Sequence, residues 1–183
     1  MRQVHIMLNS IITSKTRVKL LLKFFLNSET KSYLRNLEQE FGESTNAIRL
    51  ELNRLEDAGL LNSQVLGNRK YFNANTEHPL YNDINNILKK FVGIDKLIEK
   101  VIIQIGNLDK AYITGDFAEG KDSQIVDLVL IGNNMNTNYI DRLLVKTEKM
   151  ISRKIRHLIL TNDEMNEFFK NKPSLLIWDS THN

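Results

Sequence analysis

Six polar side chains in the first half of the chain have the types and spacing that suit contact with a nucleic acid. Four lie within residues 44–58 and two follow a Gly-Asn turn: Thr45, Asn46, Arg49, Asn53, Arg69 and Lys70. In the major groove of DNA, arginine can donate two hydrogen bonds to guanine and asparagine can pair with adenine. Arg69 and Lys70 are suited to backbone phosphates or to a minor groove.

A helix and a hairpin are needed to position these side chains. Residues 44–58 begin with the capping residue Ser44, and Gly59 suits the end of a helix. The apolar residues of this segment are spaced four and three apart: Ile48, Leu52 and Leu55. We therefore predict a helix whose polar face lies opposite the core. The alternating segments around Leu66-Gly67-Asn68 predict a β-hairpin.

Two further helices are predicted before this pair. Residues 14–27 are strongly apolar with basic residues on one side, and residues 33–41 place leucine and phenylalanine three and four apart. The short Gly42-Glu43 link between the second and third helices predicts a turn. Three helices followed by a hairpin are typical of a winged helix-turn-helix, in which the third helix reads DNA and the hairpin is the wing. A polar helix face can also be merely solvated, so the ordered set carries more weight than any one residue.

Charge and composition narrow the class of protein. Residues 1–80 hold 11 Lys and Arg against 8 Asp and Glu, and the remainder holds 14 of each. The excess positive charge therefore lies in the half expected to meet phosphates. The chain has no cysteine, which excludes disulfides and thiolate metal sites. We see no signal peptide and no apolar run long enough for a membrane helix, so we expect a soluble, cytoplasmic protein.

The second half alternates strands with helices. Helices are predicted at 81–91, 94–105, 138–152 and 162–170, and strands at 110–115, 125–132 and 154–160, with a polar loop at 116–124. We expect an α+β protein made of a winged helix-turn-helix domain (1–80), linker helices (81–106) and a small α/β domain with a mixed sheet (107–183).

The first domain resembles a known family of regulators. The run RLEDAGLLNSQVLGNRKYFNANTEHPLY, residues 54–81, is similar to the end of the recognition helix, the wing and the following linker of ArsR-like winged-helix repressors. Members of that group often sense metals through cysteine or histidine clusters. This chain has no cysteine and four scattered histidines, so the resemblance does not carry metal sensing over to it.

The second domain resembles the nucleotidyltransferase superfamily in its minimal form. The resemblance lies in YITGDFAEGKDSQIVDLVLIG, residues 112–132, and implies a nucleotide site made by Gly115, Asp116, Lys121 and Asp127. In the family pattern a Gly-Ser turn cradles phosphates and two aspartates bind divalent metal. Here Asp116 stands in place of the serine and Ile125 in place of the first aspartate. The resemblance therefore implies a degenerate site with no catalytic residues, no metal and no cofactor.

Three functions remain open on these grounds. The first is a transcriptional regulator that binds double-stranded DNA as a homodimer, with the second domain sensing a nucleotide or small-molecule effector or binding a partner. Residues 14–27 and 81–91 are the candidate dimer helices. The second is an active nucleotidyltransferase, for which Mg²⁺ would be the cofactor and Asp127 essential. The third is an antitoxin-like interaction module that masks a partner and represses its own operon.

Overall fold

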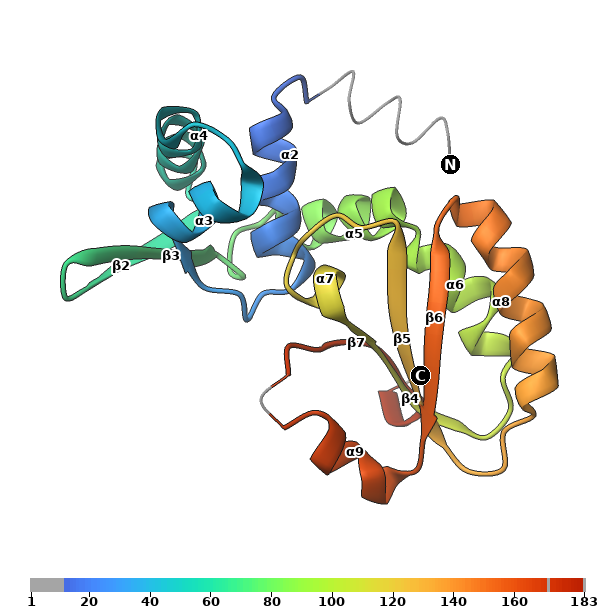
Figure 1. Ribbon diagram of the computed structural model, residues 1–183. Helices are drawn as coiled ribbons and strands as arrows, with labels where there is room; N and C mark the ends of the chain where they lie inside the picture. Colours follow the sequence, from blue (N-terminus) through green and yellow to red (C-terminus); the bar gives the residue numbers. More distant parts are fainter. Residues whose placement is uncertain (1–11, 171, 183) are drawn as a thin grey trace. The chain divides into compact units, whose positions relative to one another are not determined.

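The structure is a computed structural model that describes residues 12–170 and 172–182. Contacts within the chain divide it into two units, the first ending at Leu88 and the second beginning at Lys89. This division lies inside the segment 81–106 that we expected to link two domains. The fold is α+β: helices accompany an antiparallel sheet in the first unit and a mixed sheet in the second (Figure 1). No helix among the described residues is long and apolar enough to span a membrane.

Helices and a hairpin make up the first unit. Its elements are α2 (Lys15–Leu21), a π-helical turn (Leu22–Leu26), β1 (Ser32–Tyr33), α3 (Leu34–Phe41), α4 (Thr45–Asp57), β2 (Leu61–Leu66) and β3 (Arg69–Ala74). The Ser44 side chain accepts a hydrogen bond from the Ala47 amide and so begins α4 as predicted. Gly42 ends α3 with a φ of 62°, a backbone conformation that glycine adopts without strain. The order of three helices and a hairpin agrees with the sequence pattern.

The apolar faces of the three helices form the core of the first unit. The buried side chains include Leu20, Phe24, Leu37, Ile48, Leu52 and Leu55. Phe72 of β3 is also buried, so the inner face of the hairpin packs with the helices. The core therefore fixes α4 and the hairpin, the two elements that carry the predicted DNA contacts.

Two predictions for the first unit need correction. Ser32 and Tyr33 form a strand that pairs antiparallel with β3, and this gives a three-stranded sheet in the order β1-β3-β2. The second helix therefore begins at Leu34 rather than at Tyr33. The predicted helix 14–27 is α-helical only to Leu21, and its last turn widens to a π-helix.

The second unit is built around a four-stranded mixed sheet. Its elements after α5 (Tyr81–Val92) are α6 (Ile94–Lys100), β4 (Leu108–Thr114), α7 (Gly115–Ala118), β5 (Ile125–Gly132), α8 (Thr137–Ile151), β6 (Lys154–Leu160), α9 (Asn162–Phe168) and β7 (Leu175–Asp179). The strand order is β6-β5-β4-β7, with β5 and β6 parallel and the other pairs antiparallel. Helices α6 and α8 cover one face of the sheet, and α9 lies on the other (Figure 1).

Three predictions for the second unit also need correction. The predicted helix 94–105 ends at Lys100, and a short 3-10 turn, Ile102–Gln104, follows it. The predicted loop 116–124 begins inside a helical turn, α7. Residues Leu175–Asp179 form β7, which we did not predict, and this strand pairs with β4. Trp178 is a residue of this strand and pairs with Ala111 of β4.

Candidate functional site

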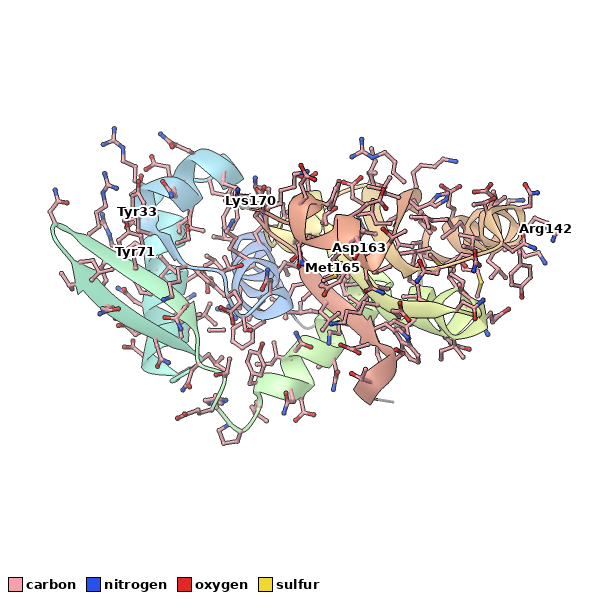
Figure 2. The ribbon with its side chains drawn as sticks, turned by 90° about the horizontal axis from the view of Figure 1, so that it is seen from below. Tyr33, Tyr71, Arg142, Asp163, Met165 and Lys170 are labelled. Carbon is pink, nitrogen blue, oxygen red and sulfur yellow. The ribbon has the colours of Figure 1, made fainter. Side chains whose placement is uncertain are left out.

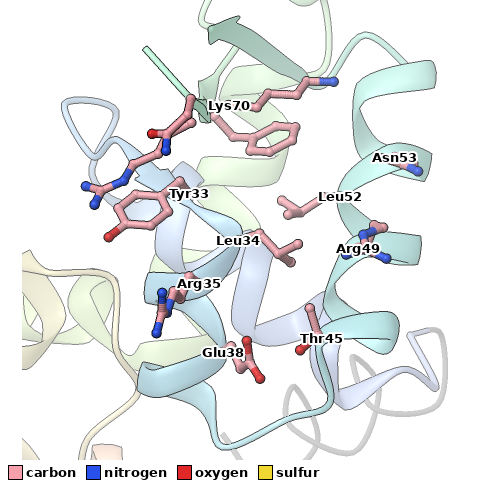
Figure 3. Close-up of a pocket in the computed structure, with 12 residues that line it drawn as sticks. Tyr33, Leu34, Arg35, Glu38, Thr45, Arg49, Leu52, Asn53 and Lys70 are labelled. Atoms are coloured by element: carbon pink, nitrogen blue, oxygen red, sulfur yellow. The ribbon is translucent and has the colours of Figure 1, made fainter. Parts of the chain in front are cut away.

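A groove of about 650 Å³ opens between α3, α4 and the β2–β3 hairpin (Figure 3). Leu34 and Leu52 point toward one another between the two helices, and the groove has an apolar floor there. The cationic side chains around it come from three elements: Arg35, Arg49, Arg69 and Lys70. Glu38 is the carboxylate among the lining residues. An apolar floor with a cationic rim suits a ligand that combines rings or sugars with negative charge.

Five of the six predicted DNA-contacting residues line this groove. They are Thr45, Arg49 and Asn53 from α4, with Arg69 and Lys70 from β3. Asn46 is exposed on α4 but does not line the groove. The structure therefore brings helix and hairpin residues together that lie about twenty positions apart in the sequence.

Arg69 is held by two tyrosines. Its guanidinium lies 4.7 Å from the centre of the Tyr33 ring, and the rings of Tyr33 and Tyr71 lie edge to face at 5.2 Å (Figure 2). A hydrogen bond with the Tyr71 side chain raises the pKa of Arg69, and the nearby Tyr33 raises it further. Stacking on an aromatic face restricts the guanidinium. Arg69 is therefore a fixed, exposed positive charge beside the turn of the hairpin.

Lys70 has a partner that the sequence did not indicate. Its Nζ lies 2.7 Å from Oε2 of Glu56, and the Ser63 hydroxyl donates to Oε1 of the same carboxylate at 2.5 Å. The hydrogen bond from Lys70 lowers the pKa of Glu56, and that from Ser63 adds to the effect. These contacts tie both strands of the hairpin to the end of α4. Lys70 therefore offers less free charge to a phosphate than we predicted.

Three basic residues of α2 and of the π-helical turn after it are also paired. Arg17 Nε lies 2.8 Å from Oε2 of the buried Glu51 on α4. Lys19 pairs with Glu43, and Lys23 pairs with Glu40. These three cations thus hold α2 against the helix-turn-helix segment. Among the described residues, Arg35, Arg49 and Arg69 of the groove form no ion pair with an acidic side chain, so we take the groove as the main cationic site.

Four lining residues with polar side chains were not among the predicted site residues. They are Tyr33, Arg35, Glu38 and Asn68. Arg35 and Glu38 lie three apart on α3, so helical spacing could have grouped them. Asn68 lies in the predicted hairpin turn. Tyr33 reaches the groove through the unpredicted strand β1, for which the local sequence gave no signal.

In the second unit, two of the predicted nucleotide-site residues, Gly115 and Asp116, lie close to a third, Asp127. Asp127 on β5 accepts two hydrogen bonds from Arg156 on β6, at 2.7 and 2.9 Å. Gly115 has a φ of 63°, and a Cβ there would lie 2.5 Å from Oδ2 of Asp127. Donation to the Asp127 carboxylate raises the pKa of Arg156, and the charge of Asp116 adds to the effect. Gly115, Asp116 and Asp127 therefore lie close together, as the signature implied.

The contacts of this cluster do not favour a metal. An arginine takes both oxygens of the one retained carboxylate, and guanidinium–carboxylate pairs of this geometry are strong. Ile125 is 36% exposed at the start of β5, and its side chain has no oxygen that could bind a cation. Lys121, which we predicted to belong to the nucleotide site, forms an ion pair with Glu119 at 2.5 Å. The described residues contain no group of three or more metal-ligating side chains.

Comparisons with known proteins give little further support. No family model matches the chain, and no curated protein matches it. One solved structure that resembles part of it is described as a "putative nucleotidyltransferase" from Sulfolobus solfataricus. The two proteins share 18% sequence identity with a TM-score of 0.35, over 52% of this chain and 86% of the other. A likeness at this level is too weak to define the activity of this chain.

Proposed function

We propose that this protein is a DNA-binding transcriptional regulator whose first unit acts as a winged helix-turn-helix. In this proposal α3 and α4 form the helix-turn-helix, α4 enters the major groove, and β2 and β3 form the wing. The observation that carries the proposal is the groove between α3, α4 and the hairpin. Four cationic side chains and one carboxylate line it, and five of its residues have side chains suited to bases or phosphates.

The arrangement of these cations supports binding to a duplex. Arg49 is exposed on α4, and Arg69 is exposed on β3 and oriented by Tyr33. A phosphodiester strand that follows the groove would meet both charges and release the counterions that they replace. We further propose that the protein binds as a homodimer, because a two-fold dimer matches a palindromic operator.

For the second unit we propose a nucleotidyltransferase-like domain that does not transfer nucleotides. The pair between Asp127 and Arg156 supports this, because it occupies the carboxylate that a metal would need. The domain would then sense a nucleotide or small-molecule effector, or bind a partner protein. An active enzyme would show Mg²⁺-dependent labelling from a nucleoside triphosphate that is lost in Asp127→Ala. We expect no labelling of the wild-type protein or of a substrate.

Binding to DNA is tested by fluorescence anisotropy with the duplex upstream of the gene and with a scrambled duplex of the same composition. We expect tight binding to the native duplex and a linear fall of log K with log salt concentration. Arg49→Ala should reduce the preference for the native duplex, because an arginine–guanine pair is worth about 1–3 kcal/mol of discrimination. Arg69→Ala should weaken binding to both duplexes equally and reduce the salt slope by about 0.9.

A matched control comes from the second unit. Arg142 is an exposed arginine on α8, so Arg142→Ala removes the same charge without touching the groove. We expect its affinity and salt slope to equal those of the wild type. The proposed regulator would be contradicted if the protein bound the native and the scrambled duplex equally and weakly and if added salt abolished both. Equal losses in all three arginine variants would show that net charge, rather than the groove, governs binding.

A further inference from the structure

Leu50 is a large apolar side chain on the outer face of α4. It is 49% exposed, whereas Ile48, Leu52 and Leu55 of the same helix are buried. Those three residues supply the packing of α4 on α2, α3 and the hairpin. Leu50 therefore contributes little to the core and is accessible to a ligand on the outer face of α4.

The surroundings of Leu50 are polar and suited to base edges. On a helix, residues three and four apart are neighbours, so Leu50 lies beside Asn46, Ala47, Asn53 and Arg54. Asn46 and Asn53 are exposed. The side chain of Arg54 is 54% exposed and pairs with Glu51. Three of the four neighbours of Leu50 thus carry hydrogen-bonding groups on the surface that would face DNA.

We propose that Leu50 is a specificity-determining residue that contacts the C5 methyl group of a thymine in the major groove. This inference rests on the proposed function of α4 as the recognition helix. In the major groove the thymine methyl is the apolar feature that distinguishes A·T from the other pairs, and apolar side chains read it by contact.

The neighbouring asparagines favour the same base pair. Asparagine accepts from and donates to the adenine edge, so Asn46 or Asn53 can read the adenine next to the methyl that Leu50 covers. A leucine in this place adds selectivity for thymine over cytosine, which has no methyl group. The inference therefore predicts an A·T pair at a fixed position of each half-site.

The test removes the methyl group and the leucine separately and together. The probe is a duplex selected on the wild-type protein from a random library, with thymine or deoxyuridine at the position of highest thymine enrichment. Replacing thymine with deoxyuridine should weaken wild-type binding about fourfold, the factor for burying one methyl group. Leu50→Ala should bind the two duplexes equally, which the double-mutant cycle measures as coupling.

A matched leucine controls for the loss of exposed apolar surface. Leu80 is 54% exposed and lies outside α4, so Leu80→Ala should keep the wild-type response to deoxyuridine. Circular dichroism of Leu50→Ala should be unchanged, because alanine favours helix. The inference would be overturned if deoxyuridine lowered the affinity of wild type and Leu50→Ala equally, or if the selected duplexes had no fixed thymine. Neither result would contradict the proposed regulator. A library that yields no preferred sequence would overturn both.

Discussion

The buried carboxylate of Glu51 should stabilise the first unit through its two arginine partners. Glu51 lies on α4 and is 5% exposed. It accepts a hydrogen bond from Arg17 of α2 at 2.8 Å and one from Arg54 at 3.2 Å. The substitution Glu51→Gln keeps the size and one acceptor oxygen but removes the charge. It thus tests whether this ion pair fixes α4 against α2.

The exposure of the two arginines sets the expected magnitude. Breaking a fully buried ion pair costs about 3–5 kcal/mol, because the remaining charge has no partner and no water. The side chains of Arg17 and Arg54 are 36% and 54% exposed, so both can turn toward solvent. We therefore expect Glu51→Gln to lower the free energy of unfolding by about 1–2 kcal/mol at pH 7.

The pH dependence of this loss has a definite sign. Burial raises the pKa of Glu51, but hydrogen bonds from Arg17 and Ser14 and the charge of Arg54 outweigh it and lower the pKa below 4.5. A carboxyl group whose pKa is lower in the folded state stabilises the fold above its unfolded pKa. That stabilisation is lost as the pH falls through the folded-state pKa. The difference between wild type and Glu51→Gln should therefore shrink below pH 4.5.

The assay is urea unfolding followed by far-ultraviolet circular dichroism at pH 7 and at pH 3, with amide hydrogen exchange of α4. Glu43→Gln is the control, because Glu43 pairs with Lys19 at the same 2.8 Å but is more exposed than Glu51. Its effect should be smaller at both pH values. The reasoning would be refuted if Glu51→Gln left the free energy of unfolding unchanged, or lowered it by the same amount at pH 7 and pH 3.

Two further predictions concern Gly115 in the second unit and Glu56, which pairs with Lys70 of the wing. Gly115→Ala should destabilise the second unit by about 1–3 kcal/mol, because it combines a positive φ with a Cβ contact on Asp127. Unfolding of the second unit can be followed by the fluorescence of Trp178 on β7. Gly106→Ala is the control: a Cβ there would have no atom within 4 Å, so the free energy of unfolding should change by under about 0.5 kcal/mol. Glu56→Gln should strengthen binding to any duplex and steepen the salt slope by about 0.9, because it releases Lys70.

Local signals in the sequence located the helices and the hairpin of the first unit. Ser44, Gly42 and the spacing of apolar residues placed α4 and the turn before it within one residue of the structure. The strands β1 and β7 escaped prediction because each forms by pairing with a strand far along the chain. A two-residue strand such as β1 has no period of its own that a sequence pattern can reveal.

The part of the candidate site that depends on residue spacing within a helix or a hairpin could be predicted from the sequence. The groove residues of α4 and β3 follow from the faces of those elements, as five of six predictions show. Ion pairs across elements do not follow from spacing. The partners of Lys70 and Asp127 depend on how α4 meets the hairpin and on the register of β5 with β6. Both pairs change the charge that is available at their sites.

The contrast between Arg69 and Lys70 gives the wing two kinds of charge. Arg69 is fixed over Tyr33 and stays available, whereas Lys70 must leave Glu56 before it can bind a phosphate. Binding through Lys70 therefore competes with the contact that ties the hairpin to α4. If Glu56→Gln leaves the salt slope unchanged, release from Glu56 adds no phosphate contact through Lys70. If the slope steepens, the wild-type protein gives up part of its affinity to hold the wing in place.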